Sequence, residues 1–134
     1  MITNSPILNP ALLAALAGAG HGHGIVVADA GLPLPAGVPV IDLSLTPGTP
    51  SFAVVVRAVL ESTPIESYVV AAESATDGSF DDWHGLDALL AHMPVTWVSH
   101  EEFTARLPSA HIVIRTGECT PYANIALIAG TTFS

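Results

Sequence analysis

Several residues that can move protons or bind hydroxyl groups occur at the ends of apolar stretches. They are His21, His23, Asp29, His100, Tyr122 and Asn124. A histidine can take or give a proton near neutral pH, and a carboxylate can orient it. Phenol and amide groups supply neutral donors and acceptors for a molecule with several hydroxyl groups. These residue types therefore favour acid–base chemistry on a neutral polyol, such as a sugar.

Two other chemistries fit the same residues less well. His21 and His23 would face the same side of an extended chain and, with Asp29, could supply three metal ligands. However, glycines flank His23 and leave its direction unfixed, and the sequence has no HxxxH or cysteine-rich motif. A dinucleotide-binding loop is disfavoured because its third glycine is missing and the loop follows a helix. We expect no metal and no cofactor; a hydrogen bond at a turn or helix end remains the alternative role for each residue.

The composition restricts the partners of this chain. It has no lysine and three arginines against 12 acidic residues, for a net charge of −9, so nucleic acid and anionic membranes are disfavoured. Only 11% of residues are charged, whereas small domains usually expose about 25–35% charged residues, which predicts that copies of the chain cover apolar surface. No apolar run approaches the roughly 20 residues of a membrane span. A single cysteine, Cys119, and the lack of positive charge before ALLAALAGAG favour a cytoplasmic protein without a signal peptide.

Helical and strand patterns alternate along the chain and predict one α/β domain over residues 1–134 with a mostly parallel or mixed sheet. Helices are expected from Pro10, capped by Asn9, to the glycines at 18–22, and over 50–60, 83–93 and 99–107, the last with a Ser99–Glu102 capping box. Strands are expected over 25–28, 65–72, 95–98, 111–114 and 124–129, with an extended segment over 38–45. Asp29 and His100 then follow strands, where ligands of α/β sheets gather. His84 and His92 are expected on a helix surface, and His111 in a structural role.

Three stretches together resemble the D-ribose pyranase family, which also includes the L-fucose mutarotases. They are GHGHGIVVADAGLP, VIDLSLTPGTPSF and VIRTGECTPYANIAL, supported by HEEF at residues 100–103. The resemblance runs from about Leu8 to Phe133. It implies a three-layer α/β/α domain and a cofactor-free cytoplasmic isomerase that interconverts the pyranose and furanose forms of D-ribose. It also implies ring-shaped homo-oligomers, commonly decamers of two pentamers, with sites near subunit contacts.

The resemblance also implies roles for individual residues. The proton donor falls on His21, and the substrate-binding residues fall on Asp29, His100, Tyr122, Ala123 and Asn124. Asp29 would hold either His21 or a sugar hydroxyl. Position 23 is a departure, because it holds histidine where the family usually has aspartate. The longer motifs are nearer the ribose branch, so we expect ribose, with L-fucose-type mutarotation or sugar binding without turnover as the alternatives.

Overall fold

A computed structural model describes residues 1–78, 83 and 85–133 of the chain. In this part of the chain one six-stranded mixed sheet is formed, in the order β2-β5-β1-β6-β3-β4. The strands are β1 (Gly24–Ala28), β2 (Val40–Asp42), β3 (Ile65–Ala71), β4 (Val95–Val98), β5 (Ile112–Arg115) and β6 (Ile125–Ala129). β6 is antiparallel to its neighbours β1 and β3, and the other pairs are parallel. The mixed, mostly parallel sheet is therefore confirmed.

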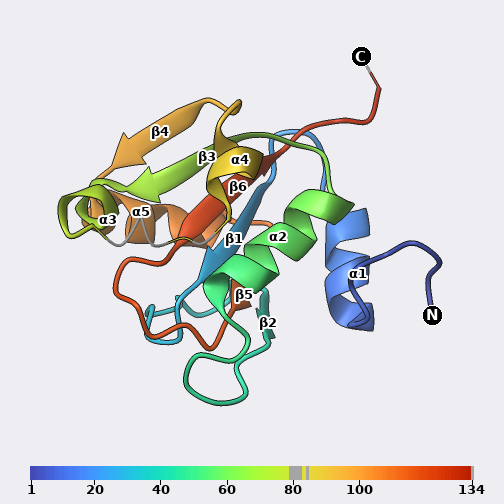
Figure 1. The fold of residues 1–134 in the computed structure, drawn as a ribbon, viewed down its shortest axis with the longest axis horizontal. Helices are drawn as coiled ribbons and strands as arrows, with labels where there is room; N and C mark the ends of the chain where they lie inside the picture. The colour runs from blue at the N-terminus through green and yellow to red at the C-terminus, as the bar shows by residue number, and fades with distance from the viewer. Residues whose placement is uncertain (79–82, 84, 134) are drawn as a thin grey trace.

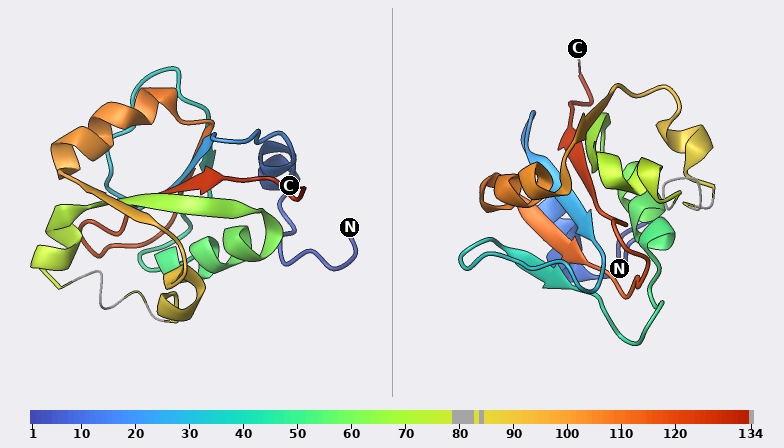
Figure 2. Two further views of the ribbon diagram at one scale, coloured as in Figure 1. Left: turned by 90° about the horizontal axis from the view of Figure 1, so that it is seen from above. Right: turned by 90° about the vertical axis from the view of Figure 1, so that its left-hand side faces the viewer.

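The side chains of β1 show why both faces of the sheet are covered. Ile25 and Val27 pack into the core cluster that includes residues of α1 (Pro10–Ala17) and α2 (Phe52–Ser62). Val26 and Ala28 point to the other face, where they pack with Phe103 of α5 (His100–Arg106). An apolar run without alternation is typical of a central strand buried on both sides. Figure 2 shows the sheet between these helices, so the expected three-layer arrangement is confirmed.

Helix starts follow the expected capping residues. The Asn9 side chain accepts a hydrogen bond from the Leu12 N–H at 2.9 Å, and the Ser99 hydroxyl accepts one from the Glu102 N–H at 3.0 Å. Ser51 caps α2 in the same way. Such caps satisfy N–H groups that have no partner within the helix.

The prediction of one helix over 83–93 is wrong in its length. The structure has only α4 (Asp87–Leu90) there, because Gly85 has a φ of +74° and Pro94 lacks the N–H that would continue the helix. His84 lies outside the described residues. Two short elements were not predicted: α3 (Ala72–Thr76) and a 3₁₀ turn over Leu107–Ser109. No helix in the described part of the chain has the length and apolar character that a bilayer crossing requires.

The strand directions define two opposite edges of the sheet. We call the carboxyl edge the one at which β1, β2, β3, β4 and β5 end and β6 begins. We call the amino edge the one at which those strands begin and β6 ends. Figure 1 shows α1 and both chain termini beside the amino edge, while the loop that enters β6 lies at the carboxyl edge.

Candidate active site at two edges of the sheet

Asp29 and Asn124 form a fixed pair at the carboxyl edge. The Asn124 amide accepts a hydrogen bond from the Asp29 N–H at 2.8 Å and donates one to Asp29 Oδ2 at 2.9 Å. The Gly31 N–H donates to Asp29 Oδ1 at 2.8 Å. Asn124 is fully buried, whereas Asp29 is half-buried. The carboxylate is therefore held in one orientation, and its remaining lone pairs can accept hydrogen bonds from a ligand's hydroxyls.

His100 and Tyr122 lie together at the same edge. Their rings meet edge to face with centroids 5.2 Å apart. His100 begins α5, and its N–H donates to both Glu73 carboxylate oxygens at 3.0 Å. His100 Nδ1 is buried and has no hydrogen-bond partner among the described residues. Such an atom needs a partner, which a sugar hydroxyl can supply.

The chain is strained at Tyr122. Its φ is +61°, a left-handed conformation that costs a residue other than glycine about 1–3 kcal/mol, and such strained residues cluster at functional sites. The next residue, Ala123, is only 1% exposed and its methyl group packs in the core. The Ala123 methyl group is therefore enclosed by the core and not exposed at the surface of the loop.

Glu118 supports the loop that carries these residues, and the sequence analysis missed it. Its Oε1 accepts a hydrogen bond from the Phe52 N–H at the start of α2, at 3.0 Å. Its Oε2 accepts one from the Thr120 hydroxyl at 2.9 Å. A cavity of about 380 Å³ is bordered by this loop and by Asp29. The exposed Cys119 also lines it.

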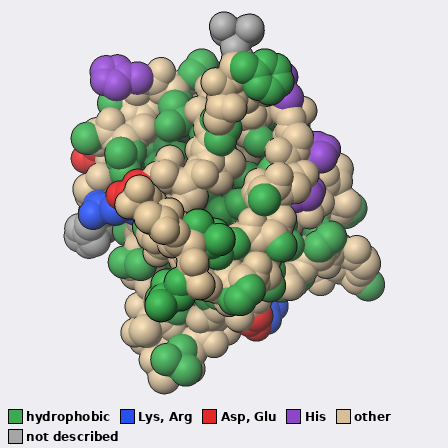
Figure 3. Space-filling model, turned by 90° about the vertical axis from the view of Figure 1, so that its right-hand side faces the viewer, with side chains coloured by type: hydrophobic (Ala, Val, Ile, Leu, Met, Phe, Trp, Pro, Cys, Tyr) green, Lys and Arg blue, Asp and Glu red, His purple; other side chains and the backbone are tan. Residues whose placement is uncertain are grey.

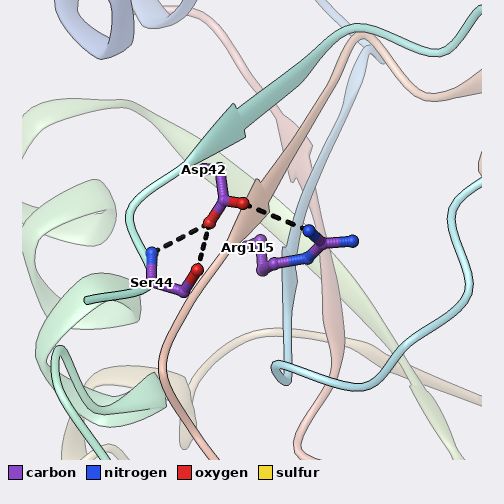
Figure 4. A network of polar contacts seen from close by, with 3 residues as sticks. All are labelled: Asp42, Ser44 and Arg115. Atoms are coloured by element: carbon purple, nitrogen blue, oxygen red, sulfur yellow. Dashed lines mark hydrogen bonds and ion pairs between the residues drawn. The ribbon is translucent and has the colours of Figure 1, made fainter. Parts of the chain in front are cut away.

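An ion pair joins β2 to β5 at the carboxyl edge (Figure 4). Arg115 Nη1 donates to Asp42 Oδ2 at 3.1 Å, and the Ser44 hydroxyl and N–H donate to Asp42 Oδ1. The hydrogen bonds from Ser44, and then Arg115, hold the pKa of Asp42 below its ordinary value of 3.8. This network joins the end of the short edge strand β2 to the end of β5, in addition to the backbone pairing of the two strands.

His21 lies at the amino edge, away from the other candidate residues. Its Nε2 is 2.9 Å from Glu66 Oε2, and Glu66 is the second residue of β3. His21 also lines a cavity of about 740 Å³ between α1, the end of α2 and the terminal segments. Nothing in the sequence pattern pointed to Glu66, because it is 45 residues from His21.

The structure brings the expected binding residues together but keeps His21 apart from them. The five residues of β1 lie between His21 and Asp29, and an extended strand of that length spans about 16 Å. The hypothesis that Asp29 holds His21 is therefore wrong for a contact within one chain. Because of the same separation, His21, His23 and Asp29 of one chain cannot bind one metal ion together. The described residues also contain no cluster of three side chains that could hold a metal ion.

The other histidines in the described part of the chain, His23, His92 and His111, behave as surface or structural residues. His92 is exposed, as expected. His111 Nε2–H donates a hydrogen bond to the Ala15 carbonyl at 2.8 Å, and His111 therefore contributes to structure; its ring stacks on that of His23, with centroids 4.9 Å apart. His23 Nδ1 accepts a hydrogen bond from the Gly20 N–H at 2.9 Å, so this histidine stabilises the turn that carries His21.

Comparison with known proteins shows which family this chain belongs to. The model of the RbsD / FucU transport protein family matches residues 2–132. The chain belongs to this family. It is 47% identical over 131 residues to a protein named D-ribose pyranase from Pseudomonas putida (strain GB-1), covering 96% of this chain and 98% of the relative. A protein of the same name from Symbiobacterium thermophilum is 49% identical over 127 residues, covering 95% and 96%.

Solved structures of other proteins share the fold of this chain. Bacillus subtilis RbsD, complexed with D-ribose, matches with a TM-score of 0.90 and 43% identity, over 99% of this chain and all of that chain. The fucose mutarotase from Streptococcus pneumoniae, in complex with L-fucose, matches with a TM-score of 0.73 and 24% identity, over 98% and 99%. The second likeness shows the fold alone, whereas the first extends to the sequence.

Proposed function

We propose that this family member is an isomerase that interconverts the pyranose and furanose forms of D-ribose. The observation that carries the proposal is the identity of 47–49% to proteins named D-ribose pyranase over nearly the whole chain. The likeness to a structure complexed with D-ribose supports the same sugar. The polar groups at the carboxyl edge are of the kind that bind a neutral sugar, and a net charge of −9 disfavours an anionic one.

The proposed reaction opens the ring and closes it through a different hydroxyl. A base takes the proton from the anomeric hydroxyl, the bond between the anomeric carbon and the ring oxygen breaks, and an acid protonates that oxygen. The open aldehyde is then attacked by the neighbouring hydroxyl, which loses its proton as the carbonyl oxygen gains one. His21 is the proposed proton-transfer residue, and positioned acid–base groups typically contribute about 10²–10⁴-fold.

The proposed binding residues are Asp29, His100, Tyr122, Ala123 and Asn124, with Ala123 acting through its place in the backbone. Asp29 and Asn124 would fix sugar hydroxyls, and His100 Nδ1 would gain the partner that it lacks in the free chain. This geometry would hold the sugar still while a proton is moved, which is the main contribution of positioning residues.

We further propose that each complete site is built from two copies of the chain. The amino edge of one copy would bring His21 to the carboxyl edge of another, since a single chain cannot bring both edges to one small sugar. Exposed apolar side chains, including Leu45 and Phe133 at 77% and 78% exposure, support burial between copies. Figure 3 shows hydrophobic side chains spread over the side that carries α1. A decamer of two pentamers in the cytoplasm, as the family resemblance implies, is proposed with it.

The proposed activity can be tested by saturation-transfer NMR. The protein is mixed with D-ribose near neutral pH, and exchange between the pyranose and furanose anomeric signals is measured, with L-fucose as a parallel substrate. Faster ribose exchange that is lost in His21→Ala supports the pyranase activity. Binding without faster exchange, or acceleration of L-fucose anomer exchange alone, would contradict it.

A further inference from the structure

The contact between His21 and Glu66 joins two elements that are separate in sequence. His21 lies in the turn between α1 and β1, and Glu66 lies near the start of β3. Their side chains meet at 2.9 Å although both are largely exposed, at 61% and 48%. Exposed ion pairs contribute little to the stability of a fold. A purely stabilising role therefore explains this pair poorly.

The backbone around His21 is fixed independently of Glu66. The Gly22 N–H donates to the Ala129 carbonyl at 2.8 Å, and the Ala129 N–H donates to the His23 carbonyl at 2.9 Å. Gly22 has a φ of +85°, which glycine adopts readily. These bonds attach the turn to the end of β6, so the main freedom left to His21 is the rotation of its side chain. The hydrogen bond to Glu66 is what limits that rotation.

Gly130 leaves room for the Glu66 side chain in this position. A Cβ atom at residue 130 would lie 3.4 Å from Glu66 Cβ and 3.6 Å from Glu66 Oε2. The Gly130 N–H also donates to the Pro64 carbonyl at 2.8 Å, which places the end of β6 against the start of β3. Strand pairing and a missing side chain thus direct the carboxylate towards His21.

We propose that Glu66 is a positioning residue that selects the tautomer of His21. A carboxylate only accepts hydrogen bonds, so neutral His21 must carry its proton on Nε2 when it contacts Glu66. Nδ1 is then the bare nitrogen that exchanges protons with the sugar. When Nδ1 gains a proton, the Glu66 carboxylate stabilises the imidazolium that forms, as the orienting carboxylate does in other acid–base sites. This inference rests on the proposed function, in which His21 moves the proton.

Three variants separate positioning from charge and from stability. Glu66→Gln keeps the size but presents an amide that either donates or accepts, so it no longer selects one tautomer. Glu66→Asp keeps the charge but shortens the reach by one methylene group. Glu102→Gln is the matched control, because it removes another exposed ion pair, that of Glu102 with Arg106 at 3.4 Å.

Two measurements are made on each variant. Ribose exchange by saturation-transfer NMR gives kcat and KM, and both Glu66 variants are expected to lower kcat by about 10- to 100-fold with little change in KM, as loss of an orienting partner does elsewhere. The ¹⁵N NMR signals of His21 are recorded without sugar. The wild-type protein and Glu102→Gln should show a protonated Nε2 and a bare Nδ1, and Glu66→Gln should show a mixture of tautomers.

The outcomes distinguish this inference from the proposed function. If Glu66→Gln keeps the wild-type tautomer and kcat, or Glu66→Asp keeps the wild-type kcat, positioning by Glu66 is refuted. If the wild-type protein does not accelerate ribose exchange, the proposed function fails. The ¹⁵N signals, which need no sugar, then still decide whether Glu66 sets the His21 tautomer.

Discussion

Two inactive variants of this protein should restore activity to each other when they assemble together. The perturbations are His21→Ala at the amino edge and Asp29→Ala at the carboxyl edge. These positions are separated by the length of β1, about 16 Å, which is far more than a proton transfer within one hydrogen bond requires. Each variant alone should lose catalysis, because every interface between copies lacks one of the two groups.

The extent of restoration follows from the two-copy geometry. In a ring assembled at random from equal amounts of both variants, half of the copies supply an intact amino edge and half supply an intact carboxyl edge. About one quarter of the interfaces then contain both, so co-assembled protein should show about one quarter of the wild-type rate. The assay is ribose exchange by saturation-transfer NMR on co-expressed chains with two different affinity tags, purified through both tags.

The control uses two variants at the same edge. Asp29→Ala with Asn124→Ala should give no restoration, because no interface regains a complete carboxyl edge. His100→Ala replaces Asp29→Ala if loss of the Asp29 carboxylate prevents folding. If co-assembled His21→Ala and Asp29→Ala chains stay inactive, the proposal that each site spans two copies is refuted.

Three further predictions concern the residues that hold the carboxyl edge in place. Asn124→Ala should lower the free energy of unfolding by about 1–3 kcal/mol, because it leaves the Asp29 N–H without its partner; an unchanged urea midpoint would contradict this. Gly117→Ala should cost about 1–3 kcal/mol, because its Cβ would clash with the Thr49 carbonyl oxygen, a backbone atom that cannot turn away; circular dichroism melts that overlay the wild type would argue against the crowding. Asp42→Asn should destabilise the protein by less than about 1 kcal/mol at pH 7, since the pair is exposed. Because folding lowers the pKa of Asp42, this contribution is present above its ordinary value of 3.8 and is lost as pH falls through the lowered value. Unfolding measured from pH 7 to pH 2 should therefore show the gap between wild type and Asp42→Asn closing in acid, and a constant gap would refute the assignment.

The sequence by itself determined the features that depend on neighbouring residues. Asn9 and Ser99 start helices because their side chains reach an N–H three residues away. The uninterrupted apolar run 25–28 predicted a strand, and the structure buries that strand on both faces of the sheet. The position of Asp29 directly after that strand placed it at the carboxyl edge, where sheets of this class bind ligands.

Local signals were weaker where elements are short. The helix expected over 83–93 shrinks to Asp87–Leu90 because Gly85 and Pro94 act against a helical pattern that the leucines favour. The left-handed conformation of Tyr122 could not be read from its residue type, since it is imposed by the loop around it. The stretch containing Tyr122 and Asn124 was nevertheless identified correctly as entering the last strand.

Only the tertiary structure decided which of the chemical groups meet. Asp29 and Asn124 are 95 residues apart, and they pair because β6 runs antiparallel beside β1 and begins where β1 ends. His21 meets Glu66 because β6 also pairs with β3, which brings the start of β3 to the amino edge. Strand order and direction depend on burying both faces of the sheet at the same time. No local sequence pattern specifies that combined requirement. For the same reason the sequence pattern grouped His21 with Asp29, His100, Tyr122 and Asn124 by chemistry alone. The fold shows that His21 lies at the opposite edge of the sheet.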